Sequence, residues 1–238
     1  WASGQLITTG INNTLVGALV GDALTDADDN TAMGRGALST DTLGSKSTAI
    51  GRNALTTQNF TTASDSHNTA VGYQAGLEVT TGIQNTFVGS LAGDATTSSS
   101  KNVAIGVNAL STNILGSNST AVGTAALFTQ NPATATDMHN TAVGFEAGKL
   151  ISTGTRNTFV GGLAGDATDD GLDNTAMGYG SLSANCGSYN TSIGIHTLSV
   201  CTGASNTCVG HAAGLAVTTG NNNLFLGNNS GRTGSPGG

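Results

Sequence analysis

The residues that could perform chemistry in this chain are few and widely spaced. Its 238 residues include four histidines, three cysteines and 14 acidic side chains. Catalysis needs titratable groups that converge in one pocket, but no Ser-His-Asp series or paired-carboxylate spacing occurs. We therefore expect a protein that is not an enzyme and that uses no cofactor. The histidines, which fall in separate segments, are His67, His139, His196 and His211.

Two of these histidines carry a weak metal signal. His67 and His139 each follow an Asp by two residues, and imidazole and carboxylate groups both bind divalent metals. Around a three-fold axis such side chains could form rings of ligands, although solvated turns explain them equally well. The acidic turns at 26–29 and 169–173 could hold calcium, but such loops are more often solvated. We expect no metal site.

The elements that position these residues are set by one repeated motif: Asn or Ser, usually Thr, a variable residue, an aliphatic residue and Gly. The motif occurs thirteen times, mostly at the interval that separates Gly17 from Gly34; two intervals are four residues longer and two are one residue shorter. A longer period of four coils also appears, because 13–17 resembles both 85–89 and 157–161. The motif glycines are Gly17, Gly34, Gly51, Gly72, Gly89, Gly106, Gly123, Gly144, Gly161, Gly178, Gly194, Gly210 and Gly227.

The repeat predicts a β-solenoid. Short segments rich in Thr and Val and bounded by Gly and Asn are typical of strands, and the glycines leave no helical apolar stripe. The hexapeptide helix needs an aliphatic residue at every sixth position, which Lys149 and Thr155 do not supply. We expect an all-β, parallel β-roll of about 13 coils of 16–21 residues over 1–230, followed by a Gly-rich tail at 231–238.

Strand alternation divides the motif between two faces, both of them apolar. We expect the aliphatic column, which includes Val71, Ile105, Val143 and Val160, to form the core. The intervening column would then be exposed along the whole rod unless other copies of the chain cover it. The predicted interface residues are Leu15, Ala70, Phe87, Ala142, Phe159 and Phe225. The repeated Thr shares the core face in this prediction, which makes an ice-binding Thr surface a remote alternative.

Three aromatic residues follow motif glycines and could contact a ligand. Tyr73, Phe145 and Tyr179 are expected to be exposed, where they could stack on sugar rings or cover the turns. The net charge of -7 and the low content of Lys and Arg argue against nucleic acid as a partner. No apolar run of about 18 residues is present, so we expect no membrane insertion.

The cysteines fall in one short stretch without a C-x-x-C pair, so a zinc site is not predicted. Alignment of Gly178 with Gly194 brings Cys201 within one position of Cys186 in the adjacent coil. Stacked backbones lie about 5 Å apart, a separation that permits a disulfide. We therefore predict a bond between Cys186 and Cys201, with Cys208 reduced and buried.

The repeats at 68–75, 119–123 and 140–147 resemble the head repeats of YadA-like trimeric autotransporter adhesins, and still more the long-coil versions in phage tail fibres. The resemblance implies a left-handed roll, a side-by-side homotrimer and attachment to a surface. The coil of this chain is longer than that of the adhesin heads, which favours a tail fibre. Glycines at every third position of 231–237 could begin a collagen-like triple helix.

The expected function is a structural fibre or adhesin head on a virion or cell surface. Its partners would be two further copies of itself and, in attachment, a glycan or protein receptor on a host. A bacterial autotransporter-type adhesin and a spacer without any ligand are the alternatives.

Overall fold

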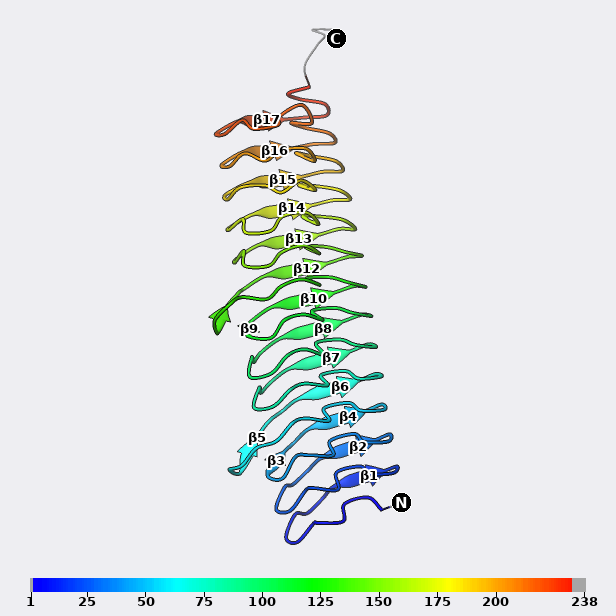
Figure 1. Cartoon of the computed structure of the whole chain (residues 1–238). Coiled ribbons are helices and arrows are strands. Elements are labelled where there is room, and N and C mark those ends of the chain that lie inside the picture. Colours follow the sequence, from blue (N-terminus) through cyan, green and yellow to red (C-terminus); the bar gives the residue numbers. More distant parts are fainter. Residues whose placement is uncertain (1, 233–238) are drawn as a thin grey trace.

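The computed structural model describes residues 2–232 as a single rod of stacked coils (Figure 1). No helix occurs among these residues, and thirteen parallel strands, one from each motif, form one long sheet. The predicted parallel β-solenoid of about 13 coils is thus confirmed. The strands are β1 (Thr14–Val16), β2 (Thr31–Met33), β4 (Thr48–Ile50), β6 (Thr69–Val71), β7 (Thr86–Val88), β8 (Val103–Ile105), β10 (Thr120–Val122), β12 (Thr141–Val143), β13 (Thr158–Val160), β14 (Thr175–Met177), β15 (Thr191–Ile193), β16 (Thr207–Val209) and β17 (Leu224–Leu226).

Two expectations concern the ends of the chain and the membrane. Most of the Gly-rich tail expected at 231–238, including its collagen-like spacing, lies outside the described residues. Within 2–232, the chain contains no helix that is long and apolar enough to cross a membrane.

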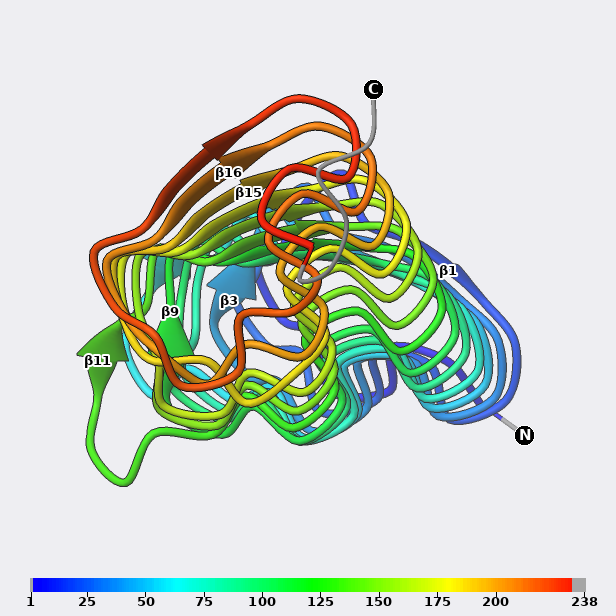
Figure 2. The same cartoon turned by 90° about the horizontal axis from the view of Figure 1, so that it is seen from above.

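The strand register follows the motif without a slip. Thr141 of β12 pairs with Thr120 of β10 and with Thr158 of β13, although a long coil separates the first pair and an ordinary coil the second. The additional residues of the long coils are absorbed outside the main sheet. There β3 (Gly44–Ser45) pairs with β5 (Ser64–Asp65), and β9 (Gly116–Ser117) pairs with β11 (Thr136–Asp137). Viewed along the rod, the turn before β11 projects beyond its neighbours (Figure 2).

The predicted assignment of the two strand faces is wrong. Ala70, Phe87, Ala142 and Phe159 are completely buried inside the single chain, so they cannot form an interface with other copies. Leu15 and Phe225, near the two ends of the rod, are partly buried against the same core.

The aliphatic column lies on the opposite face, toward the outside of the roll. Val143 and Ile105 are 36% and 39% exposed, and Val71 and Val160 are half-buried. The Thr column shares this outward face, because residues two apart in a strand point the same way.

The width of the coils explains why the faces are arranged in this way. An ordinary coil encloses a thin interior, which the central Ala of most strands fills together with buried Ala and Leu side chains of the following turn. A Phe fits only where the facing turns lack side chains. A Cβ atom on Gly93 would lie 2.5 Å from the Phe87 ring, and one on Gly165 would lie 2.6 Å from the Phe159 ring. The Phe and Gly positions are therefore complementary.

This placement of Phe159 predicts a large effect of truncation. Phe159→Ala should lower the free energy of unfolding by about 3–5 kcal/mol, because it leaves a cavity in a closely packed interior. Leu150→Ala removes a side chain that is 46% exposed, and should change the free energy of unfolding by less than about 0.5 kcal/mol. Urea denaturation followed by circular dichroism measures both. Similar losses for the two variants would contradict the assignment of the core.

Candidate functional surfaces

A buried ladder of Asn side chains holds the start of each strand. The backbone N–H of Asn157 donates to Oδ1 of Asn140 (2.9 Å), and that of Asn174 donates to Oδ1 of Asn157 (2.9 Å). The Nδ2 group of Asn157 donates to the carbonyl of Gly171 in the next coil (2.8 Å). Ser47 and Ser119 replace Asn in two coils, and their N–H groups keep the same bond to the preceding Asn. The Asn column is therefore structural: it links each coil to the next.

The side chains that point outward along the main sheet form a continuous surface that follows the thirteen strands of the rod. We call this surface the outward face. Its centre consists of the Thr column and the aliphatic column, which are half-buried or exposed in every coil. Thirteen strands about 4.8 Å apart make it on the order of 60 Å long. Each Thr contributes a methyl group, so the centre is largely apolar.

Two further columns border this centre, one on each side. The residue two before the strand Thr forms the entry rim, and the residue directly after the motif glycine forms the exit rim. Between these rims the chain advances by six residues, so they lie at opposite edges of the outward face. The entry rim consists of Asn12, Asp29, Lys46, His67, Gln84, Lys101, Asn118, His139, Arg156, Asp173, Tyr189, Ser205 and Asn222. The exit rim consists of Ala18, Arg35, Arg52, Tyr73, Ser90, Val107, Thr124, Phe145, Gly162, Tyr179, Ile195, His211 and Asn228.

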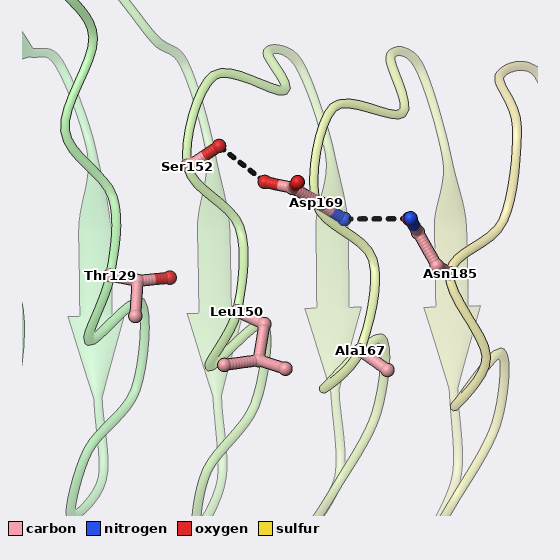
Figure 3. Close-up of a pocket in the computed structure, with 6 residues that line it drawn as sticks. All are labelled: Thr129, Leu150, Ser152, Ala167, Asp169 and Asn185. Atoms are coloured by element: carbon pink, nitrogen blue, oxygen red, sulfur yellow. Dashed lines mark hydrogen bonds between the residues drawn. The ribbon is translucent and has the colours of Figure 1, made fainter.

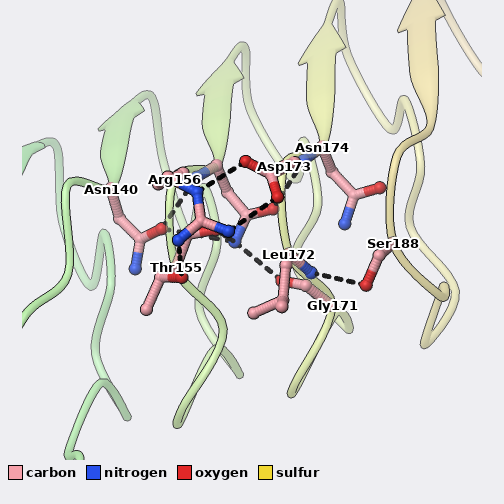
Figure 4. A network of polar contacts seen from close by, with 9 residues as sticks. Asn140, Thr155, Arg156, Gly171, Leu172, Asp173, Asn174 and Ser188 are labelled. Atoms are coloured by element: carbon pink, nitrogen blue, oxygen red, sulfur yellow. Dashed lines mark hydrogen bonds and ion pairs between the residues drawn. The ribbon is translucent and has the colours of Figure 1, made fainter.

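The entry rim is polar and contains ion pairs. Arg156 donates from Nε and Nη2 to the two carboxylate oxygens of Asp173, at 2.7 and 2.8 Å (Figure 4). This contact lowers the pKa of Asp173 and raises that of Arg156. Lys46 bonds Asp65 at 2.5 Å, which lowers the pKa of the Asp65 carboxyl. These groups lie at the surface, where water screens such pairs, so they order the rim more than they stabilise the fold.

The two histidines of the weak metal signal also lie in the entry rim. His67 and His139 are exposed and adopt left-handed backbone conformations, with φ of 50° and 53°. They are four coils apart. Within residues 2–232, no three His, Cys, Asp or Glu side chains gather into a group that could hold a metal ion.

The three aromatic glycan candidates lie in the exit rim and are 45%, 56% and 52% exposed for Tyr73, Phe145 and Tyr179. They do not form one cluster. The Arg52 guanidinium lies 5.8 Å from the centre of the Tyr73 ring. The Tyr179 ring meets His196 edge-on at 5.5 Å, and Gly162 separates it from Phe145 along the rim.

A shallow groove of about 620 Å³ crosses the coils at another part of the surface (Figure 3). Ser152 Oγ donates to Asp169 Oδ1, and the Asp169 N–H donates to Asn185 Oδ1 at 3.0 Å. Leu150 supplies an apolar wall next to these polar groups. Sequence reasoning missed this groove, because its residues come from four successive coils and share no residue type. The groove is lined by Thr129, Leu150, Ser152, Ala167, Asp169 and Asn185.

The three cysteines are buried and free, so the predicted disulfide is wrong for this structure. Cys186 and Cys201 do lie in contact, but the Sγ of Cys186 donates to the backbone carbonyl of Cys201 at 2.7 Å. The Sγ of Cys201 instead accepts from Nδ2 of Asn206 at 3.5 Å. The offset of one residue turns the two sulfur atoms to different partners. Burial raises the pKa of Cys186 to about 12, which makes its thiolate rare. Cys208 packs in the interior as predicted.

Sequence reasoning also missed a polar network beneath the first long turn. The buried carboxylate of Asp41 accepts from the N–H groups of Gly44 and Phe60, both at 3.0 Å, and from Gln58 Nε2 at 2.6 Å. Gln58 in turn accepts from Asn68 of the ladder at 2.9 Å. In the second long coil, Gln130 and Asn113 occupy the equivalent positions. The sequence could have indicated this network, because the same two positions carry Asp or Asn and Gln beside both four-residue insertions.

Comparison with known proteins gives no match: no family model, no curated protein and no solved structure is significantly similar to this chain.

Two carboxylates on the turns have pKa values raised by partial burial, Asp94 and Asp166. A raised pKa in the folded chain means that folding favours the protonated form. This contribution is present at low pH and is lost as pH rises from about 3.8 through the folded pKa. Asp166→Asn should therefore raise the melting temperature at pH 7 and have little effect at pH 3. Thermal melts at both pH values test this prediction. Asp170→Asn, at an exposed carboxylate nearby, is the control, and an equal gain there would contradict it.

Proposed function

We propose that this chain is the rod of a homotrimeric attachment fibre on a virion surface, most similar in role to a phage tail fibre. The observation that carries the proposal is the outward face. Its apolar centre is continuous over thirteen coils, and soluble monomers rarely expose so large an apolar patch. Burial of this centre against identical copies would remove the patch from water. The polar entry rim at its edge is typical of the border of a protein interface.

The number three comes from the resemblance of the motif to trimeric fibre repeats. Side-by-side packing of three rolls would direct each apolar centre toward a common axis. The same resemblance supports an extracellular or virion location and a left-handed coil. The two alternative functions, an autotransporter-type adhesin and a spacer without a ligand, would use the same trimeric rod. They differ from a tail fibre only in what the rod carries or binds.

Charge on the outward face should prevent assembly without unfolding the chain. Val143→Asp would bring three carboxylates together at the centre of the trimer, where desolvation and repulsion oppose association. Because Val143 is exposed in the single chain, the variant should retain its β spectrum but elute as a monomer. Light scattering and circular dichroism measure the two properties. Leu150→Asp, exposed but outside the outward face, is the control and should remain trimeric. A monomeric parent protein would refute the proposal.

Binding of a glycan would separate an attachment rod from a spacer. The groove between Leu150 and Asn185 offers a carboxylate, an amide and a hydroxyl next to an apolar wall, which are groups that bind sugar hydroxyls and faces. We expect the trimer to bind selected glycans on an array, and Asp169→Ala to weaken that binding at least tenfold. Arg232→Ala is a surface control. Absence of any glycan or host-cell binding would favour the spacer.

The outward position of the Thr column favours a second candidate, an ice-binding surface. Regular rows of Thr and aliphatic methyl groups on a flat sheet could order water. The argument against ice binding from the sequence depends on placing Thr on the core face, and Thr lies on the outward face. Ice binding requires a free outward face, so it predicts a monomer with thermal hysteresis. A trimer without thermal hysteresis would exclude it.

A further inference from the structure

We infer that the entry rim of one copy packs against the exit rim of the next, coil against coil, and that the exposed aromatic residues of the exit rim are contacts between chains. This inference rests on the proposed trimer. It assigns a partner to the exposed side chains of the two rims, and it identifies that partner as a second copy.

Symmetry determines which rims meet. In a parallel trimer whose axis runs along the rod, every outward face turns toward the axis. Rotation by 120° does not exchange the two edges of a face, so each entry rim must meet an exit rim. The same rotation preserves height along the rod. Residues of the same coil therefore meet at about the same level, six positions apart in the sequence but on different chains.

The second half of the rod has complementary side chains in this arrangement. His139 would lie against Phe145 of the next copy, an imidazole against an exposed aromatic ring. Tyr189 would lie against Ile195, and these side chains are 61% and 48% exposed in the single chain. Asp173 would lie next to Tyr179, whose hydroxyl can donate to a carboxylate.

The coil between these pairs would place a cation beside an aromatic ring. Arg156 shares its coil with Gly162, which has no side chain and lies between Phe145 and Tyr179 in the exit rim. Asp173 binds the edge of the Arg156 guanidinium and leaves its two flat faces free. A guanidinium stacks on aromatic faces. A Cβ atom on Gly162 would lie 3.4 Å from the Tyr179 ring, so this ring leans over Gly162. The neighbouring copy's Arg156 would therefore meet the Tyr179 ring at this level.

In the first half of the rod, this arrangement gives one pair of opposite charges and one pair of like charges. Asp29 of the entry rim shares its coil with Arg35 of the exit rim, so the trimer would form this ion pair three times. The next coil places Lys46 opposite Arg52, which are like charges. Each already has a partner within its own chain: Lys46 bonds Asp65, and Arg52 lies over Tyr73. Those contacts reduce the repulsion between chains.

Cysteine cross-linking tests the pairing directly. In the full chain, His139→Cys combined with Phe145→Cys places two thiols at opposite edges of one face. The two positions flank β12 (Thr141–Val143), whose three extended residues alone span about 10 Å, more than a disulfide permits, so the bond can form only between copies. Mild oxidation should give covalent trimers on a denaturing, non-reducing gel. The native cysteines are buried, and each single variant should remain uncross-linked.

A shifted pair supplies the matched control. His139→Cys with Tyr73→Cys uses the same two rims four coils apart, about 19 Å along the rod, and should not cross-link. A light-scattering trimer that fails to cross-link through residues 139 and 145, or that cross-links equally through the shifted pair, would overturn the inference but leave the proposed trimer intact. A monomer would overturn both.

A charge exchange provides a second measurement that does not depend on thiols. Asp29→Arg alone should make the trimer dissociate at roughly tenfold higher protein concentration, because it opposes Arg35 of the next copy. Adding Arg35→Asp should restore the original stability of the trimer. The two residues are too far apart within one chain to form a pair. A double variant that dissociates as readily as the single one would contradict the contact.

Discussion

The close stacking of successive coils at the motif glycine is the constraint on which the rest of this structure depends. A Cβ atom on Gly144 would lie 2.5 Å from the carbonyl oxygen of Gly161, and one on Gly106 would lie equally near that of Gly123. These glycines have φ near +134° to +143°, a conformation that side chains rarely adopt. Space and backbone conformation thus both require glycine, and this requirement fixes the register of every strand. At the last motif glycine, Gly227, nothing lies within 4 Å, because no further coil follows among the described residues.

Once the glycines fix the register, every other column stacks on itself and repeats one interaction. The Asn ladder satisfies buried backbone groups that a turn at the edge of a sheet would otherwise leave without partners. Insertions can then enter only where a coil leaves the main sheet. The two long turns do so with their own short strand pairs, and buried polar side chains such as Asp41 and Gln58 hold them. The rod therefore tolerates changes in coil length without loss of strand alignment.

The stacked coils and their register could be predicted well from the sequence, because the repeated motif shows them directly. Thirteen motifs, their spacing and the Asn column all follow from comparison of the chain with itself. The assignment of faces failed because both faces of the strand are apolar, so hydrophobicity alone does not distinguish inside from outside. Volume carries the information instead. Phe87 and Phe159 occur where facing turns carry Gly, and most strands with a central Ala are followed by a turn that carries Leu, which is the pattern of a filled interior. The predicted disulfide was wrong for a different reason. Alignment of the repeats places the two backbones next to each other, but it does not determine where the two sulfur atoms point.

The correction of the faces changes what the exposed residues mean. If the Phe column had been the interface, the rims would have been ordinary solvated turns and Tyr73, Phe145 and Tyr179 would have been free for ligands. With the Thr and aliphatic columns outside, the same residues border an apolar centre. Exposed aromatic groups are then better explained as the edge of an assembly than as sugar platforms. The groove around Asp169 is lined by no residue of the outward face or of either rim, so assembly through the outward face does not use the lining residues of the groove.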